Sequence, residues 1–154
     1  KCNWVRSFKK EIDVFLQTPQ LKEISYYGSG ELRFQNQLQT DTLLVNLWDA
    51  SGDLFLNINA DYSELKTHTG VGTISCVGSS TELVAYVGAN GFVKAAGTEA
   101  EEVLAVNENT ADIQVFATKL LKADIRNNGD ILYKGSPTID LFDVGDGQLR
   151  PIAK

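Results

Sequence analysis

The sequence predicts an all-β fold, a right-handed parallel β-helix (solenoid) in which short strands stack with a coil period of about 20 residues. The prediction rests on three observations. A glycine followed two positions later by an aliphatic residue recurs along the chain, most clearly at Gly30, Gly52, Gly72 and Gly129. The copies are evenly spaced, and the residues after each glycine alternate between apolar and polar, as they do in a strand with one buried face.

The spacing of the copies is the mark of a repeat architecture. The turn positions are 30, 52, 72, 91, 111, 129 and 147, which are separated by 22, 20, 19, 20, 18 and 18 residues. A leucine-rich repeat has a similar period, but it needs an Asn or Cys ladder and a helical half in each repeat. The sequence shows neither feature, so the spacing favours the β-helix.

Residues at equal distances from the turn predict which side chains face the core, because side chains alternate across a strand. The first inward column lies two residues after each turn: Leu32, Leu54, Ile74, Val93, Ile113, Ile131 and Leu149. The second lies two residues further on: Phe34, Leu56, Cys76, Ala95, Val115, Tyr133 and Pro151. The mixed column between them is expected to face outward: Arg33, Phe55, Ser75, Lys94, Gln114, Leu132 and Arg150.

The recurring glycine has an expected cause in backbone conformation. Each coil must bend sharply to enter the next strand, and glycine reaches positive φ without steric cost. The coil that lacks this glycine carries Asn107 and Asn109 before Ala111. Asparagine tolerates positive φ better than most residues, so we expect it to supply the bend there.

Taken in order, the chain begins with a strand pattern at 11–16, in which Ile12, Val14 and Leu16 share one face. We interpret this segment as the second half of a coil whose first half is missing. Seven coils are then expected at 21–34, 43–58, 65–77, 83–96, 103–117, 121–133 and 139–152, each with a strand on either side of its turn. Pro151 suits the last strand, because proline cannot donate to a further ladder. Residues 1–154 therefore form one domain, which we expect to be the C-terminal part of a longer one.

Composition excludes some partners. The net charge is −6, and no basic run is longer than Lys9-Lys10, which argues against a nucleic-acid surface and against docking on anionic lipid. No apolar run approaches the roughly 20 residues of a membrane span, and no signal peptide is visible. Cys2 and Cys76 do not have the spacing of metal ligands, and two cysteines alone do not establish whether they form a disulfide. Cys76 stands in an inward column, so we expect it to be a small buried core residue. The single histidine, His68, has no partner at metal-ligand spacing.

Four segments carry a resemblance to a known family: 27–32, 70–74, 127–137 and 144–147. They resemble the putative auto-transporter adhesin, head GIN domain family, most specifically from Ile131 to Pro137. The resemblance covers essentially the whole chain. It implies a bacterial β-helical protein at the cell surface, at the outer membrane or outside the cell. The stretch resembling 1–6 falls inside the family domain, which implies that the natural protein continues upstream. The resemblance supplies no catalytic motif.

The acidic residues that follow the turns, Glu31, Asp53, Asp112 and Asp130, could be a metal row or a catalytic pair. A single-sided row rarely supplies the 6–8 oxygens that Ca²⁺ takes, so no metal or other cofactor is expected. Glycoside hydrolysis needs two carboxyl groups flanking a bond in a groove. Glu31 and Asp53 could lie close together on neighbouring coils, but the corners are too short to build a cleft. We therefore do not expect an enzyme.

Aromatic residues before the turns suggest a binding strip for sugars or proteins. They are Tyr26, Tyr27, Trp48, Tyr86 and Phe142. Aligned on the turn, Trp48 falls in the same column as Tyr26, and His68 shares that column. Trp48, Tyr26 and Tyr27 are the predicted ligand-binding residues.

The function expected from the sequence is a non-enzymatic surface or secreted module for adhesion or ligand binding. Its partner would be a glycan or a surface protein. Two alternatives stay open: a carbohydrate-active β-helix lyase or hydrolase, and a structural spacer. Exposed end coils also predict self-association, because an uncovered strand edge can pair with another copy.

Overall fold

The computed structural model describes residues 12–143 and 145–152, which form strands and connecting segments without a helix. The strands are β1 (Glu23–Tyr26), β2 (Glu31–Arg33), β3 (Leu38–Leu47), β4 (Asp53–Thr67), β5 (Thr73–Val87), β6 (Phe92–Asn107), β7 (Ile113–Ile125), β8 (Ile131–Lys134), β9 (Thr138–Asp143) and β10 (Leu149–Pro151). The predicted all-β class is confirmed. In the described part of the chain no helix is long and apolar enough to cross a membrane.

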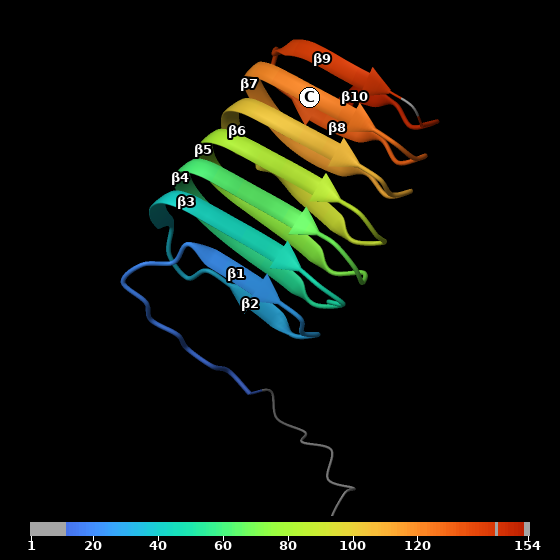
Figure 1. Cartoon of the computed structure of the whole chain (residues 1–154). Helices are drawn as coiled ribbons and strands as arrows, with labels where there is room; N and C mark the ends of the chain where they lie inside the picture. Colours follow the sequence, from blue (N-terminus) through green and yellow to red (C-terminus); the bar gives the residue numbers. More distant parts are fainter. Residues whose placement is uncertain (1–11, 144, 153–154) are drawn as a thin grey trace, which may run out of the picture.

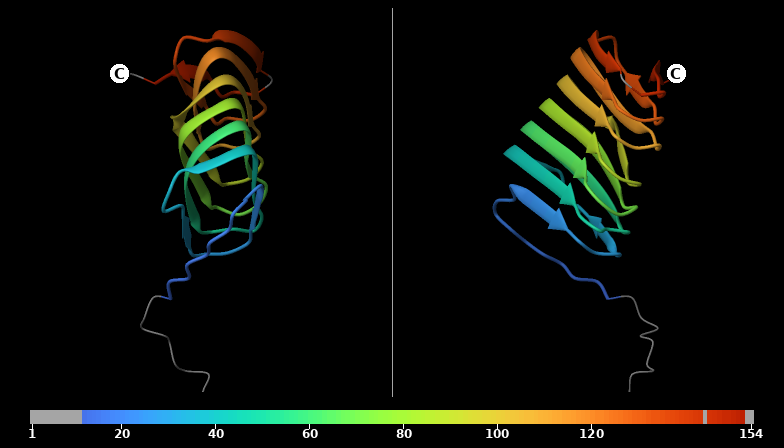
Figure 2. Two further views of the ribbon diagram at one scale, coloured as in Figure 1. Left: turned by 90° about the vertical axis from the view of Figure 1, so that its left-hand side faces the viewer. Right: turned by 45° about the vertical axis from the view of Figure 1, so that its right-hand side comes forward.

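The strands form a β-solenoid in which each strand pairs in parallel with the strand one coil later (Figure 1). The views in Figure 2 show the coils stacked along one axis, from β1 at one end to β9 and β10 at the other. The solenoid has about 6 turns of about 20 residues. We expected seven coils; the seven turn positions enclose only six full periods, so the two end coils are incomplete.

The pairing register confirms the first inward column along its whole length. Leu32 pairs with Leu54, Leu54 with Ile74, and Ile74 with Val93. The same register continues through Ile113 and Ile131 to Leu149. From Leu54 to Ile131 every member is fully buried. Stacked aliphatic side chains therefore form the long, thin core that each coil shares only with its neighbours.

The strands are longer than expected because they continue around the corners. In β4 and β5 the ladder keeps one register through the predicted corner, where Ile58 pairs with Gly78 and Ala60 with Ser80. These two coils thus bend while the pairing register is kept. The register shifts between Lys94 and Glu99 of β6, which marks a β-bulge.

The expected reason for the recurring glycine is wrong. Among the described residues the glycines with positive φ are Gly70, Gly78 and Gly135, none of them at the repeated turn position. A Cβ at Gly52 would instead lie 2.0 Å from the carbonyl oxygen of Gly30, one coil earlier. A Cβ at Gly147 would lie 2.2 Å from the carbonyl oxygen of Gly129. The column is glycine because the turns of neighbouring coils approach too closely for a side chain.

The coil without this glycine is held by asparagine, but through side chains and not through φ. Asp49 is the one non-glycine residue with positive φ in the described segments, so neither asparagine has it. The buried Asn107 donates to the carbonyl oxygens of Ala111 and Asp130, at 2.9 and 3.2 Å. Asn109 donates to the carbonyl oxygen of Gly91 at 3.2 Å. These bonds tie the turn to the coils on both sides.

The predicted strand at 11–16 is also wrong over the part that is described. Residues 12–16 contain no strand, and Ile12, Val14 and Leu16 are 78%, 72% and 90% exposed. The segment runs away from the stack in Figure 1, where no neighbouring strand pairs with it. Without a ladder partner, an alternating apolar pattern has no face to bury.

The inward placement of Cys76 is confirmed, because its side chain is 1% exposed in the core. Burial raises the pKa of the Cys76 thiol to about 11. The described residues contain no disulfide, and Cys2 lies outside them.

Candidate functional site

Aromatic side chains lie along one flank, but their columns differ from the sequence-based alignment. Tyr26 pairs with Leu47 and not with Trp48, so it belongs to an inward column. Its hydroxyl donates to the carbonyl oxygen of Gly30 at 2.7 Å. Tyr27, 65% exposed, occupies the position one coil before Trp48. Tyr26 therefore closes the end of the core, while Tyr27 and Trp48 face outward.

The error at Tyr26 has an identifiable cause. Tyr26 and Trp48 each stand four residues before their turn glycine, Gly30 and Gly52, so an alignment on the glycine places them together. The turn that follows Trp48 contains Asp49 with φ 48°, a left-handed residue that accommodates an extra position. The pairing therefore shifts by one residue between the strands before and after this turn.

Trp48 and His68 form the centre of the strip. Their rings stack at a centroid distance of 3.9 Å and an interplanar angle of 6°. A nitrogen of His68, Nε2, lies 2.9 Å from Oδ1 of Asn46, which fixes the orientation of the imidazole. The ring of Tyr86 follows at 5.7 Å from His68, tilted by 43°. Three consecutive coils thus present one continuous row of rings.

Tyr86 connects the rings to a charged end. Tyr86 belongs to the outward column next to that of Trp48 and His68. Its ring lies over Gly88, where an added Cβ would be only 2.5 Å from the Tyr86 hydroxyl. The ring can take this position because Gly88 has no side chain. The Tyr86 hydroxyl donates to Oε2 of Glu108 at 2.9 Å. Arg126 then donates to Oε1 of Glu108 at 2.5 Å and to Oδ2 of Asp124 at 2.6 Å.

We call this set of side chains the flank ladder: Trp48, His68, Tyr86, Glu108 and Arg126. Desolvation, together with the charge of Lys66, lowers the pKa of His68, so the imidazole is neutral at pH 7. Desolvation and the bond to Glu108 raise the pKa of Tyr86. The hydrogen bonds to Asp124 and Glu108 raise the pKa of Arg126. The ladder is therefore aromatic and uncharged at the Trp48 end and ionic at the Arg126 end.

Because the faces of Trp48 and His68 cover each other, the row offers a ligand its ring edges and the other face of Trp48. Such a surface can contact a sugar or a protein, because Trp and Tyr combine ring area with a polar edge. Trp48 is 37% exposed, while His68 and Tyr86 are half-buried. Phe142 pairs with Asp124 and is 63% exposed, so the flank ends in a further outward ring. The sequence analysis placed Trp48 and His68 in one column, but it did not indicate that their rings stack.

The acidic row has a structural use in two of its four positions. Oδ1 of Asp112 accepts a hydrogen bond from the backbone amide of Asp130 at 3.0 Å. Oδ1 of Asp130 accepts one from the amide of Gln148 at 2.8 Å. Glu31 and Asp53 pair in register as expected, and Arg33 binds Glu31 at 2.9 Å. Within residues 12–143 and 145–152, no three His, Cys, Asp or Glu side chains are grouped to hold a metal ion.

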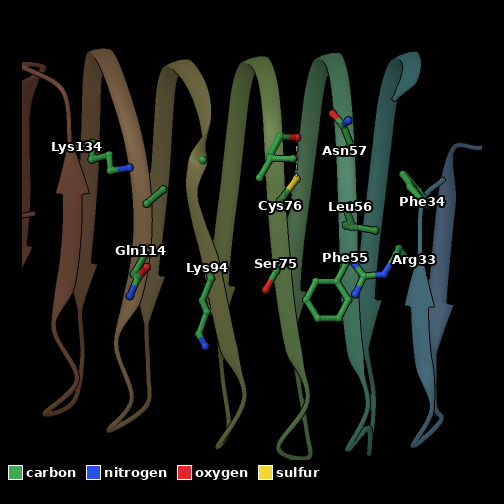
Figure 3. A pocket seen from close by; sticks show the side chains of 13 residues that line it. Arg33, Phe34, Phe55, Leu56, Asn57, Ser75, Cys76, Lys94, Gln114 and Lys134 are labelled. Atoms are coloured by element: carbon green, nitrogen blue, oxygen red, sulfur yellow. Dashed lines mark hydrogen bonds between the residues drawn. The ribbon is translucent and has the colours of Figure 1, made fainter. Parts of the chain in front are cut away.

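The other flank carries a shallow depression that the sequence analysis did not recognise. We call it the flank groove; Figure 3 shows Arg33, Phe55, Lys94, Gln114 and Lys134 around it. All of these residues except Lys134 belong to the column that the sequence predicted to face outward. This shared column was the only sign of the groove in the sequence. Their common direction was predicted, but the depression arises from the small residues between them and from the bulge in β6.

A stack of parallel coils with a ring ladder on one flank and a groove on the other defines a β-solenoid with two long lateral surfaces. Residues 2–137 match the family described as putative auto-transporter adhesin, head GIN domain. The chain belongs to this family, and the resemblance predicted from the sequence is confirmed. A search of curated proteins gave no significant match.

Two solved structures are similar to the chain. A putative adhesin from Bacteroides fragilis superposes with a TM-score of 0.82 at 29% identity, over 88% of this chain and 62% of that one. A putative lipid binding protein from Parabacteroides distasonis superposes with a TM-score of 0.74 at 26% identity, over 85% of this chain and 53% of that one. The chain thus spans less than two thirds of either protein.

Proposed function

We propose that the chain is a non-catalytic binding module of a surface or secreted adhesin, and that it holds a glycan along the flank ladder. The stacked rings of Trp48 and His68 are the observation that carries the proposal. Family membership and the similar Bacteroides fragilis adhesin support a role in adhesion. The family also favours a location at the cell surface or outside the cell.

The geometry of the ladder suits an extended ligand. The ring centroids of Trp48, His68 and Tyr86 follow one another at 3.9 and 5.7 Å, so the row extends across three coils in one direction. The stack and the bond from His68 to Asn46 hold the rings in place before a ligand arrives. Side chains that are already ordered lose less entropy on binding.

The carboxylates favour binding over catalysis. Hydrolysis of a glycoside needs two carboxyl groups on opposite sides of the bond, in a site that encloses it. In the ladder, Glu108 is engaged by both Tyr86 and Arg126, and Asp124 is engaged by Arg126. Glu31 and Asp53 are exposed on adjacent coils, and the flank groove has no carboxylate in its lining.

The test is a glycan array with a polysaccharide pull-down, performed on the wild type and on Trp48→Ala. Phe92→Ala is the matched control, because Phe92 is 36% exposed against 37% for Trp48 and lies away from the ladder. We expect Trp48→Ala to weaken binding by up to about tenfold, since an aromatic contact contributes about 0.5–1.5 kcal/mol. Phe92→Ala should bind as the wild type does.

Equal weakening in both variants would contradict the proposal, because it would show a general loss of folding or of apolar surface. Binding that survives in Trp48→Ala would also contradict it. Circular dichroism and thermal melting of both variants establish that each is folded before the arrays are compared.

A further inference from the structure

The flank groove is a second surface, separate from the flank ladder. It has a volume of about 350 Å³ and lies over the strands that follow the turns (Figure 3). Phe55, Ser75, Lys94 and Gln114 stand in one outward column, one per coil, with Arg33 at the start of the same column. The groove therefore runs across the strands, parallel to the solenoid axis.

The charge of the groove is opposite to that of the chain. Its charged lining residues are Arg33, Lys94 and Lys134, and none is acidic. The whole chain carries 20 acidic and 14 basic residues, with a net charge of −6. Arg33 forms an ion pair with Glu31, and its guanidinium also lies 4.1 Å from the centroid of the Phe55 ring. Within the described ranges, no carboxylate lies at ion-pair distance from Lys94 or Lys134.

The spacing of the cations follows from the register. Lys94 stands three coils after Arg33, and Lys134 stands two coils after Lys94. At about 4.8 Å per coil, the steps along the axis are about 14 Å and about 10 Å. Arg33 and Lys94 share one column, whereas Lys134 lies two residues beyond that column on its strand, about 7 Å to the side. The three cations are therefore spread along the groove and do not form a compact cluster, so a small anion could contact only one of them at a time.

The floor of the groove is low because its side chains are small. Ser75, Ala96 and Gly97 lie between the cations. A Cβ at Gly97 would come within 2.9 Å of Cγ1 of Val77, and the β-bulge between Lys94 and Glu99 displaces the strand at this place. Bulges change the direction of side chains and often lie next to functional sites.

We propose that the flank groove binds an extended acidic polysaccharide, whose carboxylate or sulfate groups pair with Arg33, Lys94 and Lys134. Lys94 and Lys134 are separated by about 10 Å along the axis and about 7 Å across it, a distance that two to three units of an extended sugar chain can bridge. The face of Phe55 and the amide of Gln114 meet the neutral parts of the sugars between the charges. A nucleic-acid duplex or an anionic membrane presents its charges over a broad surface and is bound by clustered cations, whereas the groove offers three separated ones.

The test is equilibrium binding of the full chain to polygalacturonate and dextran sulfate, with neutral dextran and phosphatidylserine vesicles in parallel. The groove variant is the double substitution Lys94→Gln and Lys134→Gln. The control is Lys119→Gln and Lys122→Gln, which changes the net charge equally at two exposed lysines outside the groove. A third variant, Ser75→Trp, fills the groove without a change of charge.

We expect the groove variant to bind the acidic polysaccharides about tenfold more weakly, because each exposed charge pair contributes roughly threefold. Ser75→Trp should weaken binding similarly, the control by less than about twofold, and higher salt should weaken wild-type binding. Three results would overturn the proposal: neutral dextran bound as tightly, vesicles bound in place of the polysaccharides, or equal losses in the groove and control variants. Trp48→Ala should bind normally here, so failure of this site and failure of the flank ladder are distinguishable.

Discussion

At the scale of single residues, the repeated glycine is set by contact between coils. The carbonyl oxygen of Gly30 occupies the place where a side chain at Gly52 would begin, and the Tyr26 hydroxyl stands 2.5 Å from the same point. At Gly30 the nearest atom to such a Cβ is 3.9 Å away. Two glycines at equivalent positions of the repeat therefore have different steric requirements.

This difference gives a matched pair of substitutions. Gly52→Ala should lower the free energy of unfolding by about 3 kcal/mol, because the obstructing atom belongs to the backbone and must move. Gly30→Ala should change it by less than about 0.5 kcal/mol. Chemical denaturation followed by circular dichroism measures both values. Equal effects would show that conformation, which the two positions share, and not the contact, determines the column.

His68 predicts a pH dependence of stability. Desolvation and Lys66 lower its pKa in the folded protein, so below about pH 6.5 the unfolded chain binds the proton more readily. Stability contributed by neutral His68 is present above the unfolded pKa and is lost as the pH falls toward the folded pKa. The slope from this one group cannot exceed about 1.4 kcal/mol per pH unit.

The measurement is the free energy of unfolding at pH 7.5 and at pH 5.5, for the wild type and for His68→Gln. We expect a smaller loss on acidification in the variant, because all other titrating groups are shared. An identical loss in both proteins would show that His68 does not contribute. In a Trp4→Phe background, the Trp48 emission recorded in the same experiment reports whether the stacked ring changes its environment.

At the scale of the strands, the unit of stability is the column of equivalent residues in successive coils. Thr67 is buried between Leu47 and Val87 in one such column, and its hydroxyl has no hydrogen-bond partner among the described residues. Ser63 is buried between Leu43 and Leu83 in another. Unlike Thr67, Ser63 shares a hydrogen bond of 2.9 Å with Ser80.

The two columns predict opposite effects. Thr67→Val keeps the shape of the side chain and removes an unpaired polar group, so it should raise the free energy of unfolding by about 1 kcal/mol. Ser63→Ala removes a made hydrogen bond and should lower it by about 1 kcal/mol. Urea unfolding of the two variants tests the pair. A loss of stability in Thr67→Val would mean that its hydroxyl is satisfied in solution.

At the scale of the whole molecule, most of the fold could be predicted because the repeat is visible in the sequence. The offset from Gly52 to Leu54 recurs in each coil and gives the strand register directly, and the pairing confirms it. The segment 12–16 could not be predicted, since its alternating pattern does not say whether a partner strand is present. A segment with alternating apolar residues forms a strand only where a neighbouring strand can hydrogen-bond with it.

The surfaces were less predictable than the core. Trp48 and His68 stand in one column, which could be read from the sequence, and their rings stack along it. Tyr86 stands in the next column and joins the row only because its ring lies over Gly88. Side-chain rotation of this kind leaves no periodic signal. The flank groove needed the bulge in β6 as well, and a bulge alters the register only locally.

The central claim is that ligands are held on the flank ladder, and Trp48 itself can report on it. The chain has two tryptophans, so a Trp4→Phe background leaves Trp48 as the single emitter. We would titrate this protein with the glycan that the array selects and record the Trp48 fluorescence. The account predicts a saturable change in emission whose midpoint equals the dissociation constant from the pull-down. Saturable binding with unchanged Trp48 emission would contradict it and would place the ligand elsewhere on the solenoid.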